Sequence, residues 1–224
     1  SSFSVYRTDL LARGGELDES AQVESVGIAK GTYGFAKTQQ ERIFRELQEK
    51  FGFEWSIVRP GVIYGPGGGA LSPRVGLSVL GLFFSLGRNA LLPLSYVTNC
   101  SDAIASVAIS APSGSIYNIV DDDLPTCSAY LRAYRQRVGS LRVVPLPYWL
   151  LLAGSKALLK YNRASKGQLP AVLTPYMVRS MFRPLRYSNA AIKQLGWTQS
   201  IPTADAMERS FSAWRAARDA GSIG

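Results

Sequence analysis

The run of residues 33–51 constrains the fold of this chain most. Its apolar side chains recur with helical spacing, and Gly52 directly after it is a natural C-terminal stop. Tyr33 and Lys37 stand four residues apart at its start, so a helix stacks a phenol and an ammonium group on one face. A nearby cation lowers the pKa of a tyrosine toward the working range of an acid–base catalyst. The pair therefore indicates acid–base chemistry, although a single pair of this kind also arises by chance.

Further stretches before and after this helix give the pair a context. They are residues 1–6 (Ser-Ser-Phe-Ser-Val-Tyr), 55–67 (ending Arg-Pro-Gly-Val-Ile-Tyr-Gly-Pro-Gly), 96–103, 116–121 and 195–197. In this order the stretches resemble the extended short-chain dehydrogenase/reductase family, in its NAD-dependent epimerase/dehydratase branch. The resemblance runs over nearly the whole chain. It implies that Ser2, Tyr33 and Lys37 are a catalytic trio.

The resemblance implies an α/β fold, a partial Rossmann-like, doubly wound parallel sheet with a smaller, mostly helical C-terminal substrate lobe. Residues 1–142 would be the C-terminal part of the Rossmann-like domain, with substrate-lobe segments interleaved at 66–95. Residues 143–224 would be the substrate-binding lobe and the C-terminal helix. The glycine-rich nucleotide fingerprint of the family, Gly-x-x-Gly-x-x-Gly, does not occur in this sequence. We therefore expect a fragment of a longer protein, with a degenerate remnant as the alternative.

The family's mechanism assigns a role to each member of the trio. Tyr33 would exchange a proton with a substrate hydroxyl or carbonyl while a hydride moves to or from the nicotinamide of NAD or NADP. Lys37 would lower the pKa of Tyr33 and hold the nicotinamide ribose. Ser2 would hydrogen-bond the reacting oxygen. Cofactor-binding residues would thus include Tyr33 and Lys37 themselves.

The strand that ends near residue 60 supplies the remaining cofactor contacts that the resemblance implies. Pro60, Gly61 and Val62 would pass beside the nicotinamide. The glycine-rich loop 67–69 precedes an apolar stretch, and such a turn could cradle a phosphate. Because its spacing is not that of the family fingerprint, we interpret it as a connection on the substrate side.

The net charge of +9 and the pI near 9.7 favour anionic partners such as nucleotide diphosphates, nucleic acid or an anionic membrane surface. No basic run is interleaved with aromatic residues, so we expect no nucleic-acid partner. The alternative is that the basic residues form a solvated surface that binds no anionic partner. As candidate substrate-binding residues we name Arg74, Arg183 and Arg186, the last two for a pyrophosphate group.

Three functions remain open at this point. The first is an NAD(P)-dependent epimerase, dehydratase or reductase acting on a nucleotide-diphosphate sugar. Val62 and Leu94 stand where sugar-nucleotide members usually have Asn and a basic residue, and the apolar stretch 149–152 resembles the 3β-hydroxysteroid dehydrogenase-like branch. The second function is therefore an oxidoreductase on a hydrophobic alcohol, with a weak contact to a membrane surface. The third is a non-catalytic dinucleotide-sensing module on the same fold.

Several kinds of site are excluded or disfavoured by residue content. Histidine is absent, which excludes histidine bases and histidine-ligated metals, and we expect no metal site. The run Asp121–Asp123 is predicted to be a solvated turn and helix cap rather than a metal site. Cys100 and Cys127 are predicted to be buried, reduced thiols of a cytoplasmic protein. No apolar run is long enough to span a bilayer. By family analogy, the helix 33–51 would pair with its mate in a homodimer.

The remaining pattern predicts the other elements. We expect a polar surface loop over 7–31, a strand from residue 53 that ends at Pro60, and an apolar helix from about Val75. A helix over 101–111, a strand over 116–120 and a helix over 128–138 follow. The last helix is predicted to begin at Thr203 as its N-cap.

Overall fold

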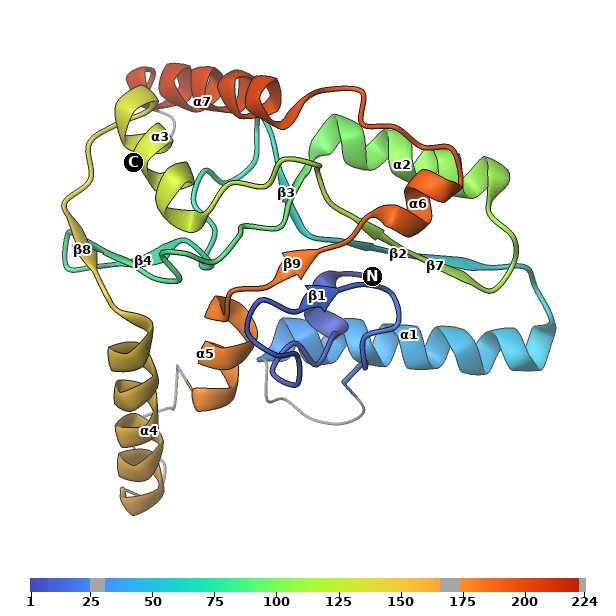
Figure 1. The fold of residues 1–224 in the computed structure, drawn as a ribbon, viewed down its shortest axis with the longest axis horizontal. Helices are drawn as coiled ribbons and strands as arrows, with labels where there is room; N and C mark the ends of the chain where they lie inside the picture. Colours follow the sequence, from blue (N-terminus) through green and yellow to red (C-terminus); the bar gives the residue numbers. More distant parts are fainter. Residues whose placement is uncertain (25–30, 166–173, 222–224) are drawn as a thin grey trace.

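The computed structural model describes residues 1–24, 31–165 and 174–221. Its centre consists of parallel strand pairs (Figure 1): β2 (Ser56–Pro60) with β7 (Ser115–Ile119), and β3 (Val62–Tyr64) with β6 (Leu94–Tyr96). Helices α1 (Thr32–Phe51) and α2 (Val97–Ser110) lie on opposite sides of the β2–β7 pair in Figure 1. The predicted α/β class with a partial doubly wound parallel sheet is confirmed.

Helix α1 has the predicted extent and ends as expected at Gly52. That glycine adopts a left-handed conformation, with φ of 68°, and its N–H donates to the carbonyl oxygen of Gln48 at 2.8 Å. Glycine is the residue that enters this conformation without steric cost, so it closes the last turn. The strand predicted to end at Pro60 is β2, and a second short strand, β3, begins after Gly61.

The apolar helix predicted from Val75 is wrong. The segment instead forms a hairpin of β4 (Gly76–Val79) and β5 (Leu82–Ser85), to which β8 (Val143–Pro145) adds in parallel. Leu80 and Gly81 make the two-residue turn with φ of 49° and 76°. Positive φ at both central residues is the geometry that matches the twist of a tight hairpin. The β-favouring residues of the run outweigh its continuous hydrophobicity, which by itself does not distinguish a helix from strands.

The N-terminal segment pairs with a strand of the C-terminal lobe. The turn η1 (Phe3–Val5) leads into the predicted loop 7–31, of which residues 25–30 lie outside the described residues. Within this loop β1 (Glu16–Leu17) pairs in parallel with β9 (Arg186–Tyr187), and the side chain of Leu17 is fully buried. The loop is therefore part of the packed structure as well as of the surface.

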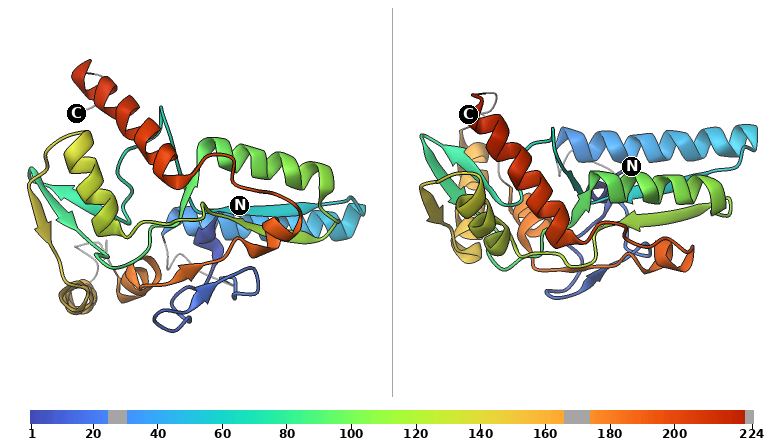
Figure 2. Two further views of the ribbon diagram at one scale, coloured as in Figure 1. Left: turned by 45° about the horizontal axis from the view of Figure 1, so that its top comes forward. Right: turned by 90° about the horizontal axis from the view of Figure 1, so that it is seen from above.

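The C-terminal lobe is mostly helical, as predicted. Its described residues form α4 (Tyr148–Ala164), α5 (Pro175–Phe182), α6 (Ala190–Gln194) and α7 (Thr203–Asp219), and α3 (Cys127–Arg137) precedes the predicted start of the lobe at residue 143. Figure 2 shows α7 beside α3, and the rings of Tyr130, Phe211 and Trp214 fill the space between these helices. The predicted N-cap at Thr203 is wrong, because Pro202 occupies that position and Thr203 is the first helical residue.

The predicted solvated turn at Asp121 is also wrong. The carboxylate of Asp121 is buried and accepts hydrogen bonds from the Tyr64 hydroxyl at 3.0 Å, the Asn99 amide at 3.0 Å and the backbone N–H of Tyr96. Burial raises the pKa of Asp121, and the bond from Asn99 opposes that rise. Through these hydrogen bonds Asp121 connects the end of β7 to β3, β6 and α2. Asp122 and Asp123 are exposed.

Both cysteines are free and buried, as predicted. Burial raises the pKa of Cys100 and of Cys127 to about 11. The two groups are therefore protonated thiols at neutral pH, packed in two different hydrophobic clusters.

A buried ion pair joins α1 to the sheet. Arg59 on β2 donates two hydrogen bonds to the carboxylate of Glu41, at 2.8 and 2.6 Å. Both side chains are almost entirely buried. Burial raises the pKa of Glu41, but the hydrogen bonds from Arg59 and Ser1 outweigh it, so the pKa of Glu41 lies below its ordinary value. A lowered carboxylate pKa stabilises the fold above the pKa of the unfolded chain, and this stability is lost as the pH falls through the folded-state pKa.

We predict that Glu41→Gln lowers the free energy of unfolding at neutral pH by about 3–5 kcal/mol, because it leaves the Arg59 charge buried without its partner. Below pH about 4.5 the stability of the variant should also fall less steeply than that of the wild type, because Gln does not titrate. Urea denaturation of both proteins between neutral and acidic pH measures the two effects. The matched control is Glu46→Gln on the exposed face of α1, whose pair with Arg42 is exposed on both sides. Its removal should cost less than about 1 kcal/mol. Equal losses of unfolding free energy in the two variants would contradict the conclusion that the buried pair stabilises the fold more than the exposed pair.

Candidate active site

A cavity of about 320 Å³ lies where β2 ends and β3 begins. This is the carboxyl end of a parallel strand, where open α/β sheets place their ligands. The cavity brings together five residues that the sequence analysis selected, from four separate parts of the chain. They are Ser2, Tyr33, Gly61, Val62 and Arg74.

Tyr33 lies in the first turn of α1, and its side chain is 60% exposed toward the cavity and the solvent. Lys37 follows one turn later, with Nζ 5.8 Å from the centre of the Tyr33 ring. Its ammonium donates a hydrogen bond to Oε1 of Gln40 at 3.1 Å, and the residue stands beside the cavity rather than in its lining. The two side chains share one face of the helix, as their spacing predicted.

Ser2 is the N-cap of η1. Its hydroxyl oxygen accepts a hydrogen bond from the backbone N–H of Ser4 at 3.3 Å. A hydroxyl group carries one donor hydrogen in addition to its acceptor sites. Ser2 can therefore hold the turn with one lone pair and still donate to an oxygen atom in the cavity.

A buried network fixes the relative positions of these elements. The Arg59 guanidinium lies 4.7 Å from the centre of the Tyr6 ring, and the Tyr6 hydroxyl donates to Oδ1 of Asn118 at 2.7 Å. Burial raises the pKa of Tyr6, so the phenol is a neutral donor. Together with the pair between Arg59 and Glu41, these contacts join α1, β2, β7 and the segment after η1. They set Ser2 and Tyr33 on the same cavity.

The Pro60–Gly61–Val62 stretch crosses one side of the cavity. Gly61 donates its N–H to the carbonyl oxygen of Ile119 at 3.0 Å, and Val62 donates to that of Pro93 at 2.6 Å. A side chain at Gly61 would meet the Pro93 carbonyl oxygen and Val120, so the close approach of the two chain segments requires glycine. Pro60 itself is buried in β2, and only Gly61 and Val62 line the cavity.

The three candidate arginines are in three different places. Arg74 lines the cavity beside Tyr33, and its guanidinium donates to the carbonyl oxygen of Met181 at 3.3 Å. Arg183 donates to the carbonyl oxygens of Asp9 and Leu11 and lines a second cavity. Arg186 is exposed on β9, with a guanidinium nitrogen 3.8 Å from Glu16, and it lines neither cavity.

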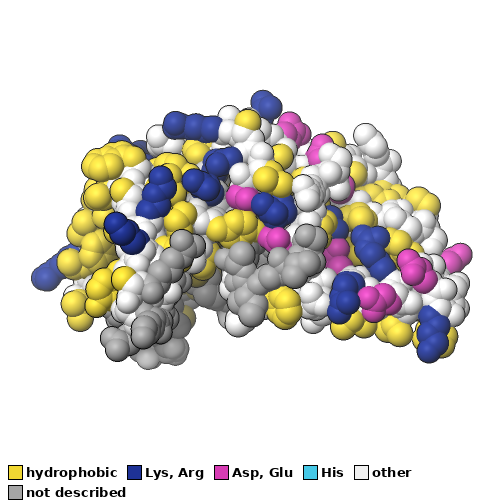
Figure 3. Space-filling view, turned by 90° about the horizontal axis from the view of Figure 1, so that it is seen from below, with side chains coloured by type: hydrophobic (Ala, Val, Ile, Leu, Met, Phe, Trp, Pro, Cys, Tyr) yellow, Lys and Arg dark blue, Asp and Glu magenta, His cyan; other side chains and the backbone are white. Residues whose placement is uncertain are grey.

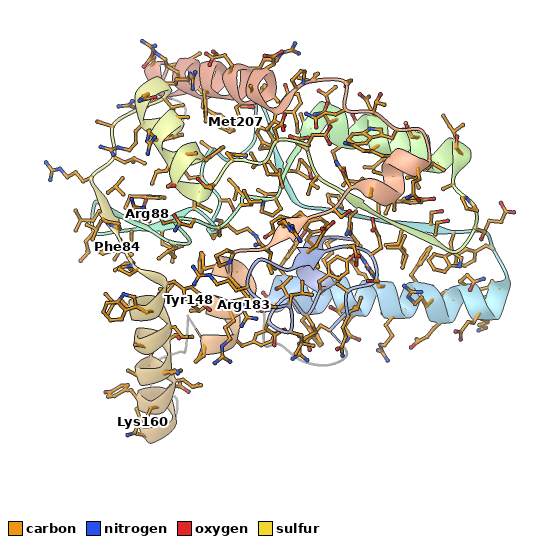
Figure 4. The ribbon with its side chains drawn as sticks, in the orientation of Figure 1. Phe84, Arg88, Tyr148, Lys160, Arg183 and Met207 are labelled. Carbon is orange, nitrogen blue, oxygen red and sulfur yellow. The ribbon has the colours of Figure 1, made fainter. Side chains whose placement is uncertain are left out.

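The second cavity, of about 730 Å³, lies between the start of α4 and the end of α5. Figure 4 shows Arg183 and Tyr148 next to each other at the top of α4, with Arg88 above them. Sequence analysis missed Arg13 and Arg88 as partners of Arg183, because no local motif marks either residue. Met181 lines the first cavity and Phe182 the second, so the end of α5 separates the two.

The first cavity also contains residues that no sequence signal indicated. Thr8, Met177 and Ser180 line it, and the Thr8 hydroxyl donates to the carbonyl oxygen of Ser180 at 2.9 Å. These residues come from the loop after η1 and from α5. Because the tertiary fold alone brings them to Tyr33, periodicity and spacing could not have found them.

Among the described residues, no group of three or more His, Cys, Asp or Glu side chains is placed to hold a metal ion. In the same part of the chain, no helix is both long and apolar enough to cross a membrane. The glycine loop 67–69 lines neither cavity, and the carbonyl oxygen of Gly68 accepts a hydrogen bond from Trp214 at 2.9 Å.

Comparison with protein families gives one match. Residues 5–96 match the NAD-binding family model described as Male sterility protein. The matched segment includes Tyr33, Lys37 and the β2–β3 stretch that borders the cavity. No curated protein sequence matches the chain.

Solved structures share the fold along nearly the whole chain. UDP-glucose 4-epimerase of Thermus thermophilus in complex with NAD superposes with a TM-score of 0.65 at 17% identity, over 96% of this chain and 63% of that one. UDP-glucuronic acid 4-epimerase of Bacillus cereus, in complex with UDP-glucuronic acid and NAD, gives 0.65 at 13% identity, over 96% and 60%. RMD of Pseudomonas aeruginosa, complexed with NADPH, gives 0.62 at 15% identity, over 96% and 65%.

These findings define the class of the fold. The chain has the Rossmann-like fold of the NAD-dependent epimerases, and the family match agrees with that fold. The expected resemblance to the C-terminal portion of an extended short-chain dehydrogenase/reductase is confirmed. The chain spans less than two thirds of the length of each of these structures.

We predict that Gly61→Ala destabilises the protein by about 1–3 kcal/mol, because the new methyl group must displace the Pro93 carbonyl or Val120. Thermal and urea unfolding measure the loss. Gly69→Ala is the matched control, since a side chain there meets nothing within 4 Å. If Gly61→Ala is as stable as the control, then the contact of Gly61 with Pro93 and Val120 does not require glycine.

Proposed function

We propose that this chain carries the catalytic part of an NAD(P)-dependent oxidoreductase or epimerase/dehydratase of the short-chain dehydrogenase/reductase type. The observation that carries the proposal is the convergence of Ser2, Tyr33, Gly61 and Val62 on one cavity, with Lys37 one helical turn from Tyr33. The family match over residues 5–96 and the NAD or NADPH complexes of structurally similar proteins support it.

The residues present fit the nicotinamide end of the cofactor. Gly61, Val62 and Pro93 offer a largely apolar wall, and hydroxyl groups of Ser2 and Tyr33 lie at the same cavity. A nicotinamide ring has an apolar face and a polar amide edge, and this lining suits both. When bound, the cofactor supplies the hydride chemistry.

In the proposed mechanism, the side chains of this chain handle the proton and position the substrate. Tyr33 gives a proton to, or takes one from, the substrate oxygen at its phenol group. The Lys37 ammonium lies 5.8 Å from the centre of the Tyr33 ring, and its proposed role is to hold the nicotinamide ribose. Ser2 donates its hydroxyl hydrogen to the reacting oxygen and so orients it. Arg74 lines the substrate side of the cavity.

As the substrate we propose a nucleotide-diphosphate sugar, the class of ligand bound in the UDP-glucuronic acid complex of the Bacillus cereus epimerase. The sugar would lie beside Tyr33. The diphosphate would face the second cavity, where Arg13, Arg88 and Arg183 gather positive charge. Arg186 lies outside both cavities and would contribute only to the surrounding field.

A hydrophobic alcohol is the second candidate substrate. Val62, Met177 and Met181 give the first cavity an apolar side. Methionine side chains adapt to irregular apolar ligands. In this case the arginines of the second cavity would bind an anionic group elsewhere on the substrate.

The expected homodimer and cytoplasmic location remain proposals. The outer face of α1 supports a dimer, because Ile43, Leu47 and Phe51 recur at successive turns and are 47%, 43% and 65% exposed. Such a stripe is typical of a helix that packs against another helix.

We predict that Tyr33→Phe lowers kcat for cofactor-linked turnover by about 10²–10⁴-fold in the full-length protein, because it removes the proton-transferring group. Absorbance of the reduced nicotinamide measures the rate, and cofactor fluorescence titration checks that the rate is measured with the variant saturated by cofactor. Tyr161→Phe, an exposed tyrosine on α4, is the control and should keep the wild-type rate. Full activity in Tyr33→Phe would exclude Tyr33 as the acid–base group. Cofactor binding without turnover in the wild type would instead indicate a sensing module.

The substrate class has its own test. We predict that UDP binds the full-length protein and that Arg88→Ala and Arg183→Ala each weaken this binding by about tenfold or more, since each removes a charged donor. Titration calorimetry measures the affinity, with the exposed Arg132→Ala on α3 as control. Arg183 also bonds backbone carbonyls, so Arg88→Ala is the cleaner variant. Unchanged affinity in both variants would exclude the second cavity as the diphosphate site.

A further inference from the structure

The three-stranded β4–β5–β8 sheet has an apolar outer face. Cross-strand pairing places five side chains on one side of this sheet, while Phe83 points to the opposite side and into the core. The five are Leu77, Val79, Leu82, Phe84 and Val144. Leu80 extends this face at the hairpin turn and is 97% exposed. A sheet with one solvated face normally alternates apolar and polar residues, so an apolar outer face indicates a surface that contacts something else.

Helix α4 continues this surface. It follows β8 after two residues, and Figure 1 shows it at the same end of the molecule as the hairpin. Trp149, Leu150 and Tyr161 are exposed on one side of the helix, with Lys156 and Lys160 on the same side. Figure 3 shows hydrophobic side chains gathered at this end with basic side chains among them.

An apolar groove borders the exposed side of α4. Leu150, Gly154 and Leu158 line a shallow groove of about 190 Å³ together with Leu146. Leu146 also lines the second cavity. Apolar surface therefore extends from the outside of α4 to the cavity that contains the arginines.

The charge of this end restricts the kind of partner. Residues 55–101 and 124–204 contain no Asp or Glu, and the second of these stretches contains twelve Lys and Arg residues. These stretches supply the hairpin, β8, α4 and α5. A second copy of this chain would bring the same positive surface against itself without carboxylates to pair with it. An anionic partner is the electrostatic complement.

We propose that the outer faces of β4–β5–β8 and α4 form one surface that docks this protein on an anionic lipid bilayer. The exposed Leu and Val side chains enter the acyl boundary, and Trp149 and Tyr161 lie at the headgroup level, where amphipathic rings are favoured. Lys156 and Lys160 pair with anionic headgroups. This surface lies outside the Tyr33 cavity, and Trp149 is its one exposed residue that also lines the second cavity. Docking on a bilayer does not depend on the proposed catalytic function.

Flotation of the full-length protein with lipid vesicles tests the proposal. We expect the protein to float with vesicles of phosphatidylcholine containing about 30 mol % phosphatidylglycerol and to bind pure phosphatidylcholine at least about tenfold more weakly. Binding should fall as salt is added. Equal binding to the two compositions, or no binding to either, would overturn the proposal.

Two variants locate the surface. Leu80→Ser combined with Trp149→Ser removes two exposed apolar contacts and should reduce partitioning to the anionic vesicles by about tenfold or more. The apolar control is Ile109→Ser, an 84% exposed residue at the end of α2 on the other side of the molecule. It should bind like the wild type. Loss of binding in the control as large as in the double variant would overturn the assignment to this end.

The charge variant is Lys156→Gln combined with Lys160→Gln, which should weaken vesicle binding by about tenfold or more and reduce its salt dependence. Its control is Arg209→Gln combined with Arg215→Gln on α7, at the opposite edge in Figure 1. Size-exclusion chromatography of the wild type and the Leu80/Trp149 variant without lipid completes the test. If the wild type is a dimer that this variant dissociates, then a second copy covers the surface and the lipid proposal is wrong.

Discussion

The buried pair between Arg59 and Glu41 is the interaction on which the site depends. Two charged groups at this depth are tolerated because the guanidinium meets the carboxylate through two parallel hydrogen bonds and stacks on the Tyr6 ring. Glu41 lies on the same face of α1 as Tyr33 and Lys37. The pair therefore sets the rotation of α1 about its axis, and with it the direction in which the phenol faces.

The same network determines where the other wall of the cavity stands. Oδ1 of Asn118 on β7 accepts a hydrogen bond from the Tyr6 hydroxyl. The N–H of Gly61 donates to the carbonyl oxygen of Ile119, the next residue along that strand. On the other side of the sheet, Asp121 holds β3, β6 and α2 together. A proton-transfer site needs positions held to a fraction of an ångström. In this chain buried polar contacts, rather than the side chains proposed to be catalytic, hold those positions.

The sequence was informative where local chemistry determines local structure. The extent of α1, its end at Gly52 and the strand that ends at Pro60 were predicted from spacing and turn residues, and the structure confirms them. The prediction failed from Val75, where a continuous apolar run fits a helix and a hairpin equally well until pairing with β8 decides between them. It failed at Asp121 because three adjacent carboxylates look alike in sequence, while only the first faces the core.

The sequence by itself determined which chemical groups are present and which family the chain resembles. The groups are a phenol and an ammonium one helical turn apart and a serine hydroxyl, and the Arg-Pro-Gly-Val stretch is part of the resemblance. Only the tertiary structure decided that Arg74 accompanies Tyr33 while Arg183 lies at a different cavity with Arg13 and Arg88. It also decided that the apolar face of β4–β5–β8 and the basic, aromatic face of α4 lie at one end of the molecule. The physical reason is that spacing along a chain fixes neighbours within a helix or strand. Contacts between distant segments follow from the packing of whole elements against one core.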